Sequence, residues 1–156
     1  MKSIIINKVT KEKKNNGISG EYYDFKNQSI FINKLFLKED FEDSDILKQE
    51  LFKKRSSYRS QDLKKERLTD NFITYDDIVE KLVISKLKCS YCRDNVLLLY
   101  KNKRDNNQWT LDRIDNDKEH TKENTVISCL KCNLQKRRRD DKKFRFTKQM
   151  NLIKIF

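Results

Sequence analysis

The sequence predicts an α+β fold in which a basic helical extension precedes a small zinc-stapled module, meaning one held together by a metal ion. Two Cys-x-x-Cys pairs offer the metal ligands, and a helical repeat of apolar residues begins near Asp43. Short apolar runs between the two pairs indicate strands. We therefore expect loosely ordered strands and loops over 1–42, a basic helical extension over 43–73 and the zinc-stapled module over 74–156.

The composition indicates a small core and a polyanionic partner. Of the 156 residues, 36% are hydrophobic and 38% are charged, and 36 Lys and Arg outnumber 24 Asp and Glu to give a net charge of +12. A small core is marginal by itself, so a bound metal would add useful stability. The excess positive charge favours nucleic acid as partner, although a biased composition with a solvated surface would look the same.

Secretion and membrane insertion are not expected. No apolar stretch approaches the roughly 20 residues that span a bilayer, and lysines follow the short apolar start at Ile4–Ile6. We expect a location in the cytoplasm or nucleus. In such a reducing compartment, paired cysteines act as metal ligands more readily than as disulfides.

A first helix is expected to run from a cap at Asp43 or Ser44 to about Arg55, because Ile46, Leu47, Leu51 and Phe52 have helical spacing. Polar and basic residues continue beyond it. They either lie along phosphates or form a merely solvated face. The basic candidates for nucleic-acid binding in this extension are Arg55, Arg59, Lys64 and Lys65.

A second helix is expected after Thr74, which with Asp77 resembles a capping box. The apolar stripe that follows should be core and should pack on the zinc module. Its members are Ile78, Val79, Leu82, Val83 and Leu87.

Further along, the segments 96–100 and 109–111 are predicted to be two strands joined by a polar turn, and 126–128 is predicted to be a third extended piece. A helix with a basic open face should follow Cys132 and continue through the aromatic residues near Phe146. Its candidates for phosphate contact are Lys136, Arg137, Arg138 and Arg139.

The four cysteines of the chain form two knuckles with the spacing of a tetrahedral zinc site, and they are Cys89, Cys92, Cys129 and Cys132. Four thiolates leave no open position for water, so this zinc ion is expected to be structural. The competing interpretation is a redox dithiol, which needs one Cys-x-x-Cys pair and gives no reason for the second.

Three stretches carry a further pattern: W-T-L-D-R-I-D-N at 109–116, H-T-K-E-N at 120–124 and C-L-K-C-N at 129–133. Together they resemble the HNH, or His-Me finger, endonucleases. The resemblance is closest to their zinc-stapled, endonuclease VII-like branch and to short proteins of phages and large DNA viruses. It covers about 74–156 and implies a ββα-metal finger, in which a hairpin and a helix hold one divalent ion.

The resemblance implies that Asp112 and Asn133 are ligands of a magnesium or manganese ion and that Asn124 pins the hairpin loop. Hard oxygen ligands suit these ions, which can stabilise charge at a scissile phosphate. The residues alone also allow a structural interpretation, in which Asp112 caps a turn and Asn133 caps the final helix.

The sequence departs from the family at Arg113, because the general-base histidine of the family stands at that position. Arginine cannot take a proton from water, but it can clamp a phosphate. His120, the chain's single histidine, lies in what should be a surface loop and is a candidate base. Asp115 is another candidate, either for water activation or for a second metal contact.

Three functions follow from these observations. The first is a metal-dependent endonuclease that hydrolyses phosphodiester bonds in double-stranded DNA, either as a monomer or as the homodimer that many nicking enzymes form to break both strands. The second is a non-catalytic zinc module that binds DNA or RNA and has lost the base. The third, a protein-interaction zinc module, would present apolar grooves rather than the basic run at 136–139.

Overall fold

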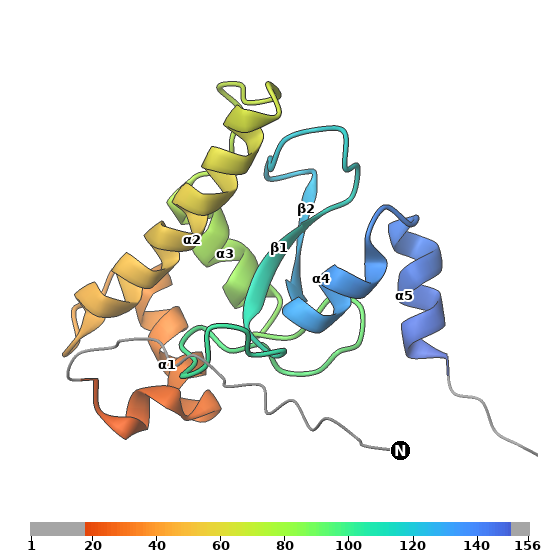
Figure 1. Cartoon of the computed structure of the whole chain (residues 1–156). Helices are drawn as coiled ribbons and strands as arrows, with labels where there is room; N and C mark the ends of the chain where they lie inside the picture. Colours follow the sequence, from red (N-terminus) through yellow and green to blue (C-terminus); the bar gives the residue numbers. More distant parts are fainter. Residues whose placement is uncertain (1–17, 151–156) are drawn as a thin grey trace, which may run out of the picture.

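The computed structural model describes residues 18–150 and places a two-stranded hairpin between two groups of helices (Figure 1). A 3-10 turn, η1 (Gly20–Tyr23), precedes the helices α1 (Phe25–Phe36), α2 (Ser44–Lys64) and α3 (Tyr75–Ile84) on one side of the hairpin. The hairpin pairs β1 (Trp109–Arg113) with β2 (Thr125–Cys129), and on its other side lie α4 (Leu130–Lys136) and α5 (Asp141–Gln149). The predicted α+β class is confirmed.

The prediction of strands and loops before residue 43 is wrong for the described residues, because α1 is a regular helix. The Asp24 carboxylate caps this helix by accepting a hydrogen bond from the backbone N–H of Lys26 at 3.1 Å. Ile32 and Leu35 are buried on its inner face. The strand-prone run Ile4–Ile6 lies outside the described residues.

Helix α2 confirms the predicted helix that starts at Ser44, but it continues past Arg55 to Lys64. Asp43 occupies the capping position in a left-handed conformation with φ of 59°, and its side chain makes no capping hydrogen bond. Leu47 and Leu51 are buried. Further along, Asp62 is also completely buried, which a solvated basic helix would not require.

Helix α3 has the predicted capping box. Thr74 Oγ1 accepts a hydrogen bond from Asp77 N at 3.1 Å, and the Asp77 carboxylate accepts one from Thr74 N at 3.2 Å. The predicted stripe faces inward at Ile78, Val79 and Leu82, and α3 packs on α1, α2 and β2. The helix therefore does pack on the cysteine module, as expected.

The segments 96–100 and 109–111 were predicted to be two strands joined by a polar turn. The second is confirmed as part of β1, but the first is wrong, because 96–100 forms no strand. The pairing strand of β1 is β2, in the register Thr110 opposite Ser128 and Asp112 opposite Val126. The 96–100 segment is a buried irregular stretch whose backbone is bonded by a side chain of α1. Gln28 Oε1 accepts from Leu98 N at 2.7 Å, and Gln28 Nε2 donates to Leu99 O at 2.9 Å. Leu97 forms a single parallel bridge, in which its N–H donates to Asn107 O at 2.8 Å and its carbonyl accepts from Trp109 N at 3.0 Å. The buried amide of Gln28 thus bonds the neighbouring backbone groups that no strand engages.

The single basic helix expected after Cys132 is two helices. Helix α4 ends at Lys136, because Arg137 adopts a positive φ of 54°, and α5 begins after Asp140. The Asp140 carboxylate accepts a hydrogen bond from Lys143 N at 2.9 Å and so caps α5. This break lets α5 turn back beside the first cysteine knuckle (Figure 1), where Phe144 packs edge-on against Tyr91.

One hydrophobic core joins all of these parts. It includes Tyr22 before α1, Leu47 of α2, Leu82 of α3, Trp109 of β1 and Phe144 of α5. The boundaries expected near residues 42 and 73 therefore do not separate different cores. No helix within residues 18–150 is long and apolar enough to span a membrane.

Candidate functional site

The four cysteine sulfurs come together and could hold one metal ion. Their Sγ atoms all lie within 4.8 Å of one another, and the Sγ atoms of Cys92 and Cys129 are 3.9 Å apart. Four sulfurs at zinc–sulfur distances of about 2.3 Å and tetrahedral angles would be separated by about 3.8 Å. The cluster is therefore compatible with the predicted structural zinc.

The backbone around the knuckles orients the thiols. Tyr91 N donates to Cys89 Sγ at 3.4 Å, and Cys132 N donates to Cys129 Sγ at 3.4 Å. Ser90 N donates to Ile127 O at 2.8 Å, which joins the first knuckle to β2. N–H groups that point at the sulfurs stabilise thiolates, which are the form that binds metal.

Asp112 lies on the face of β1 that meets α4. Side chains alternate along a strand, so Thr110 and Asp112 share this face. The Asp112 side chain is buried, and its Oδ2 accepts hydrogen bonds from Tyr91 Oη at 2.5 Å and from Lys136 Nζ at 3.0 Å. Within residues 18–150 no hydrogen bond or ion pair engages Oδ1. Burial raises the pKa of Asp112, and the contacts with Tyr91 and Lys136 only partly offset this rise.

Asn133 approaches the same face from α4. Thr110 Oγ1 gives its single hydrogen to Ser128 O at 2.9 Å, so it can only accept from Asn133. Asn133 Nδ2 makes this bond at 3.1 Å. The amide oxygen of Asn133 therefore points away from Thr110 and takes part in no hydrogen bond within the described part of the chain. The side chains of Asp112 and Asn133 are therefore each held by hydrogen bonds through one atom. Asp112 Oδ1 and the amide oxygen of Asn133 have no hydrogen bond within residues 18–150.

Lys136 was predicted to contact nucleic acid, and this prediction is wrong. Its side chain is completely buried, with Nζ 3.0 Å from Asp112 Oδ2 and 2.8 Å from Arg113 O. A buried ammonium needs such partners, because transfer from water without them costs several kcal/mol. Lys136 holds α4 against β1 from the inside.

Arg113 lies on the opposite face of β1 from Asp112, toward α2. Its NH1 donates to Asn116 O at 3.1 Å and to Lys118 O at 3.2 Å, and it lies 4.0 Å from Asp62 Oδ1. These contacts order the β1–β2 loop. The guanidinium is therefore used within the chain instead of projecting into solvent for a phosphate.

Asn124 closes the same loop. Its Oδ1 accepts from Asp115 N at 2.8 Å, and its Nδ2 donates to the carbonyls of Asp115 and Glu119, both at 2.9 Å. The amide thus bonds both ends of the segment before β2. These are the contacts that a loop-pinning asparagine should make.

The sequence indicated that His120 lies in a surface loop, and this is wrong, because His120 is buried against α2. The backbone N and the ring Nδ1 of His120 both lie 2.8 Å from Asp62 Oδ2, and the Tyr58 ring packs on the imidazole at 4.7 Å between centroids. Its side chain is 3% exposed, so it cannot reach a phosphate at the surface. The structure makes His120 an internal anchor of α2 and argues against its use as a base.

The Asp62–His120 pair predicts that acid destabilises the protein. Burial lowers the pKa of His120 more than Asp62 raises it, and Arg113 and Arg67 lower it further. For Asp62 burial raises the pKa, but hydrogen bonds from His120 and Arg67 outweigh it and lower the pKa. Both folded-state pKa values therefore lie below the unfolded ones. His120 contributes stability above its ordinary pKa near 6.5, and this is lost as the pH falls.

The measurement is the free energy of unfolding of the zinc-loaded protein by urea at pH 8 and at pH 5.5, with zinc content checked at both. The free energy of unfolding of the wild type should fall by at most about 1.4 kcal/mol, because pH 5.5 lies one pH unit below the ordinary pKa of histidine near 6.5. His120→Asn keeps an N–H toward Asp62 but cannot titrate, so it should lose less. Equal losses in both proteins would show that His120 does not titrate in this way.

Asp115 and the remaining basic candidates are exposed, except for Arg55, which is half-buried. Asp115 accepts from Asp117 N at 3.0 Å and lies 3.8 Å from Lys118 Nζ, and no described hydrogen bond or ion pair joins it to Asp112. Arg55 donates to Ile73 O at 2.8 Å and is only partly free for a ligand. Arg138 pairs with Asp117. The basic side chains left in solvent on these segments are Arg59, Lys64, Lys65, Arg137 and Arg139.

Comparison of the chain with models of protein families, with curated proteins and with solved structures finds no match. Function is therefore argued from the contacts of the site itself. Those contacts place Asp112 and Asn133 on the same face of the hairpin, with Asn133 bonded to Thr110, and they remove Lys136 and His120 from the surface.

Three residues that matter here were not singled out from the sequence. Tyr91 and Thr110 hold Asp112 and Asn133, and Asp62 holds His120. Thr110 carried a signal, because it precedes Asp112 by two residues and so shares its face of the strand. Tyr91 and Asp62 carried none, since their partners are 21 and 58 residues away along the chain.

Proposed function

We propose that this chain is a metal-dependent endonuclease that hydrolyses phosphodiester bonds in DNA and contains a structural zinc ion. The observation that carries the proposal is the pair Asp112 and Asn133. Both are anchored through one atom, and each keeps an oxygen without a hydrogen bond on the same face of the hairpin. Such oxygen pairs suit magnesium or manganese, with water and phosphate completing the coordination.

The surrounding contacts prepare this pair for a ligand. Tyr91 and Lys136 hold the Asp112 carboxylate by one oxygen, and Thr110 fixes the rotation of the Asn133 amide. Hydrogen bonds from neighbours that orient ligands in this way are a general feature of metal sites. A divalent ion bound there would stabilise the charge that develops on the phosphate. The zinc cluster holds the hairpin and α4 at the base of the site.

Proton transfer is the weak part of this site. Arg113 replaces the expected histidine, and His120 is buried against Asp62 on the other face of the hairpin. Neither side chain can take a proton from water beside Asp112. We therefore expect slow cleavage that becomes faster as pH rises, because the concentration of hydroxide rises with pH.

The test is cleavage of a supercoiled plasmid by zinc-loaded protein with added magnesium or manganese. Asp112→Asn removes the charge of the carboxylate but keeps its shape, and it should lower the rate by at least about 100-fold. Asn133→Ala should have a similar effect. The control is Asp117→Asn, which removes an exposed carboxylate of the β1–β2 loop and should cleave at the wild-type rate.

A second function is favoured by Arg113. Without a base, the same scaffold would serve as a zinc module that binds nucleic acid and does not cut it. In that case the wild type would shift the plasmid on a gel but leave it supercoiled with either metal. If the wild type nicks the plasmid and Asp112→Asn does so equally well, the assignment of the metal ligands is wrong.

A further inference from the structure

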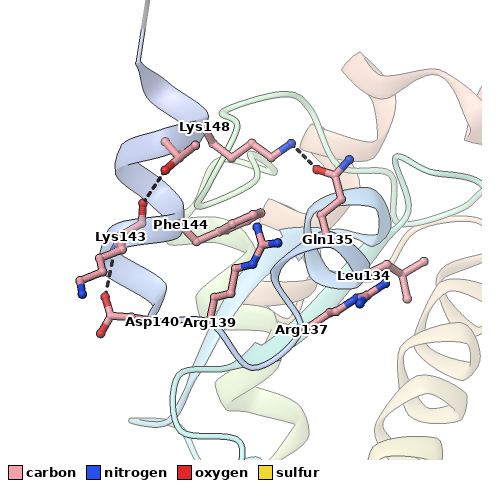
Figure 2. A pocket seen from close by; sticks show the side chains of 9 residues that line it. Leu134, Gln135, Arg137, Arg139, Asp140, Lys143, Phe144 and Lys148 are labelled. Carbon is pink, nitrogen blue, oxygen red and sulfur yellow. Dashed lines mark hydrogen bonds between the residues drawn. The ribbon is translucent and has the colours of Figure 1, made fainter.

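A groove of about 1000 Å³ lies between α4 and α5 on the side of α4 turned away from the hairpin (Figure 2). Figure 2 shows basic side chains from α5 and from the turn that joins it to α4, with one apolar side chain from each helix. The basic residues are Arg137, Arg139, Lys143 and Lys148, and the apolar ones are Leu134 and Phe144.

The positive charge of this groove is not neutralised within the described part of the chain. Residues 18–150 place no acidic side chain in an ion pair with Arg137, Arg139 or Lys143. By contrast, the neighbouring Arg138, which does not line the groove, forms an ion pair in which its NH2 lies 2.5 Å from Asp117 Oδ1. The single acidic residue of the groove, Asp140, uses its carboxylate to accept from Lys143 N at the start of α5.

The wall of the groove is apolar in addition to being charged. Phe144 is buried and fixed by its edge-on contact with Tyr91, at 5.1 Å between ring centroids. Lys148 lies over the Phe144 ring and donates a hydrogen bond to Gln135 Oε1, so it connects α5 to α4. Leu134 of α4 also lines the groove and is 63% exposed. A well-matched ligand would therefore carry both anionic groups and an exposed flat apolar surface.

We propose that the groove between α4 and α5 binds single-stranded nucleic acid, with phosphates at Arg139 and Lys143 and a base against Leu134. The proposal rests on the proposed function, because it takes nucleic acid as the substrate. An unpaired strand offers both phosphates and base faces, and proteins bind it in cationic grooves where bases stack on aromatic side chains. In this groove the exposed apolar side chain is Leu134, on which a base would make van der Waals contact. A duplex stacks its base faces inside and would leave Leu134 unused.

The position of the groove connects it to the candidate metal pair. Asn133 and Leu134 are consecutive on α4, and they point to the hairpin and to the groove respectively. A strand held in the groove would therefore lie next to the helix that carries one of the two candidate ligands. The groove would favour DNA substrates that contain an unpaired segment.

The test is fluorescence anisotropy with a labelled 20-nucleotide DNA, single-stranded or annealed to its complement, in buffer without magnesium. The groove variant is Arg139→Gln with Lys143→Gln. The matched control is Arg59→Gln with Lys64→Gln, which removes the same charges from α2 across the hairpin. The groove variant should bind the single strand about tenfold more weakly. The slope of the logarithm of its binding constant against the logarithm of salt concentration should become shallower by about 1.4, because two phosphate contacts are lost. The α2 variant should change both quantities much less.

Leu134→Ala tests the apolar contact without a change of charge. It should weaken single-strand binding by about fivefold and leave duplex binding unchanged. Because Leu134 is exposed, the variant should keep the wild-type melting temperature. The proposal is overturned if the wild type prefers the duplex, if Leu134→Ala binds the single strand normally, or if the α2 pair matters as much as the groove pair.

The two proposals fail in different ways. If the wild type cuts plasmid but the groove variant binds and cuts normally, the groove assignment is wrong and the endonuclease stands. If the protein binds single strands through the groove but never cuts, the endonuclease is wrong and the groove assignment stands. Absence of any binding to either DNA would overturn the groove and remove the support for nucleic acid as substrate.

Discussion

Removal of the metal from the four-cysteine cluster is expected to unfold the C-terminal half of the chain. The first knuckle follows α3, and the second begins at the end of β2, so one ion bound by both would connect segments about 40 residues apart. Structural zinc contributes about 10–16 kcal/mol in zinc-finger peptides. That is as much as the whole stability of an ordinary domain, about 5–15 kcal/mol. The small apolar fraction leaves little to compensate for its loss.

The measurement is thermal unfolding followed by circular dichroism, with and without a zinc chelator, alongside the zinc content of the purified protein. We expect one zinc ion per chain and loss of a cooperative transition after chelation, with recovery when zinc is returned. Cys129→Ser should behave like the chelated protein. Lys131→Ser, an exposed position within the same knuckle, should melt like the wild type. A chelated protein with an unchanged transition would contradict a structural role for the ion.

Replacement of Lys136 by methionine is expected to destabilise the protein by about 3–5 kcal/mol. Methionine has nearly the same length, but it leaves the buried Asp112 carboxylate without its cation and Arg113 O without a donor. For a chain of this size each kcal/mol lowers the melting temperature by roughly 2–4 °C. A fall of about 10 °C is therefore expected.

The control for this prediction is Arg138→Met, two residues further along. Arg138 also forms an ion pair, with Asp117, but the side chains of Arg138 and Asp117 are 74% and 79% exposed, and such pairs contribute about 0–1 kcal/mol. The double variant Lys136→Met with Asp112→Asn should regain part of the loss, since no unpaired charge is then buried. Equal melting temperatures for Lys136→Met and Arg138→Met would show that Lys136 is not buried as described.

Local patterns were sufficient for several features of this protein. The capping box at Thr74 and Asp77, the inward stripe of α3 and each of the two Cys-x-x-Cys pairs depend on spacings of a few residues. The helix α1 also had a local signal that was overlooked. Asp24 is a good capping residue, and Gln28, Ile32 and Leu35 recur at helical spacing.

Other features depend on partners far away in the chain. The segment 96–100 is as apolar as a strand, but its backbone is bonded by Gln28, about 70 residues earlier. His120 looked like a loop histidine until Asp62 and Tyr58 of α2 enclosed it. No local pattern contains either of these contacts.

The run Lys136-Arg137-Arg138-Arg139 shows where sequence stops and tertiary structure decides. The sequence by itself determined that this segment is strongly basic and that it follows a cysteine knuckle. The tertiary structure assigned a different environment to each residue. Lys136 is buried on Asp112, Arg138 pairs with Asp117, and Arg137 and Arg139 line the groove. The physical reason is that charge is a property of the residue, whereas the partner of that charge depends on how the hairpin, the loop and α5 pack around α4.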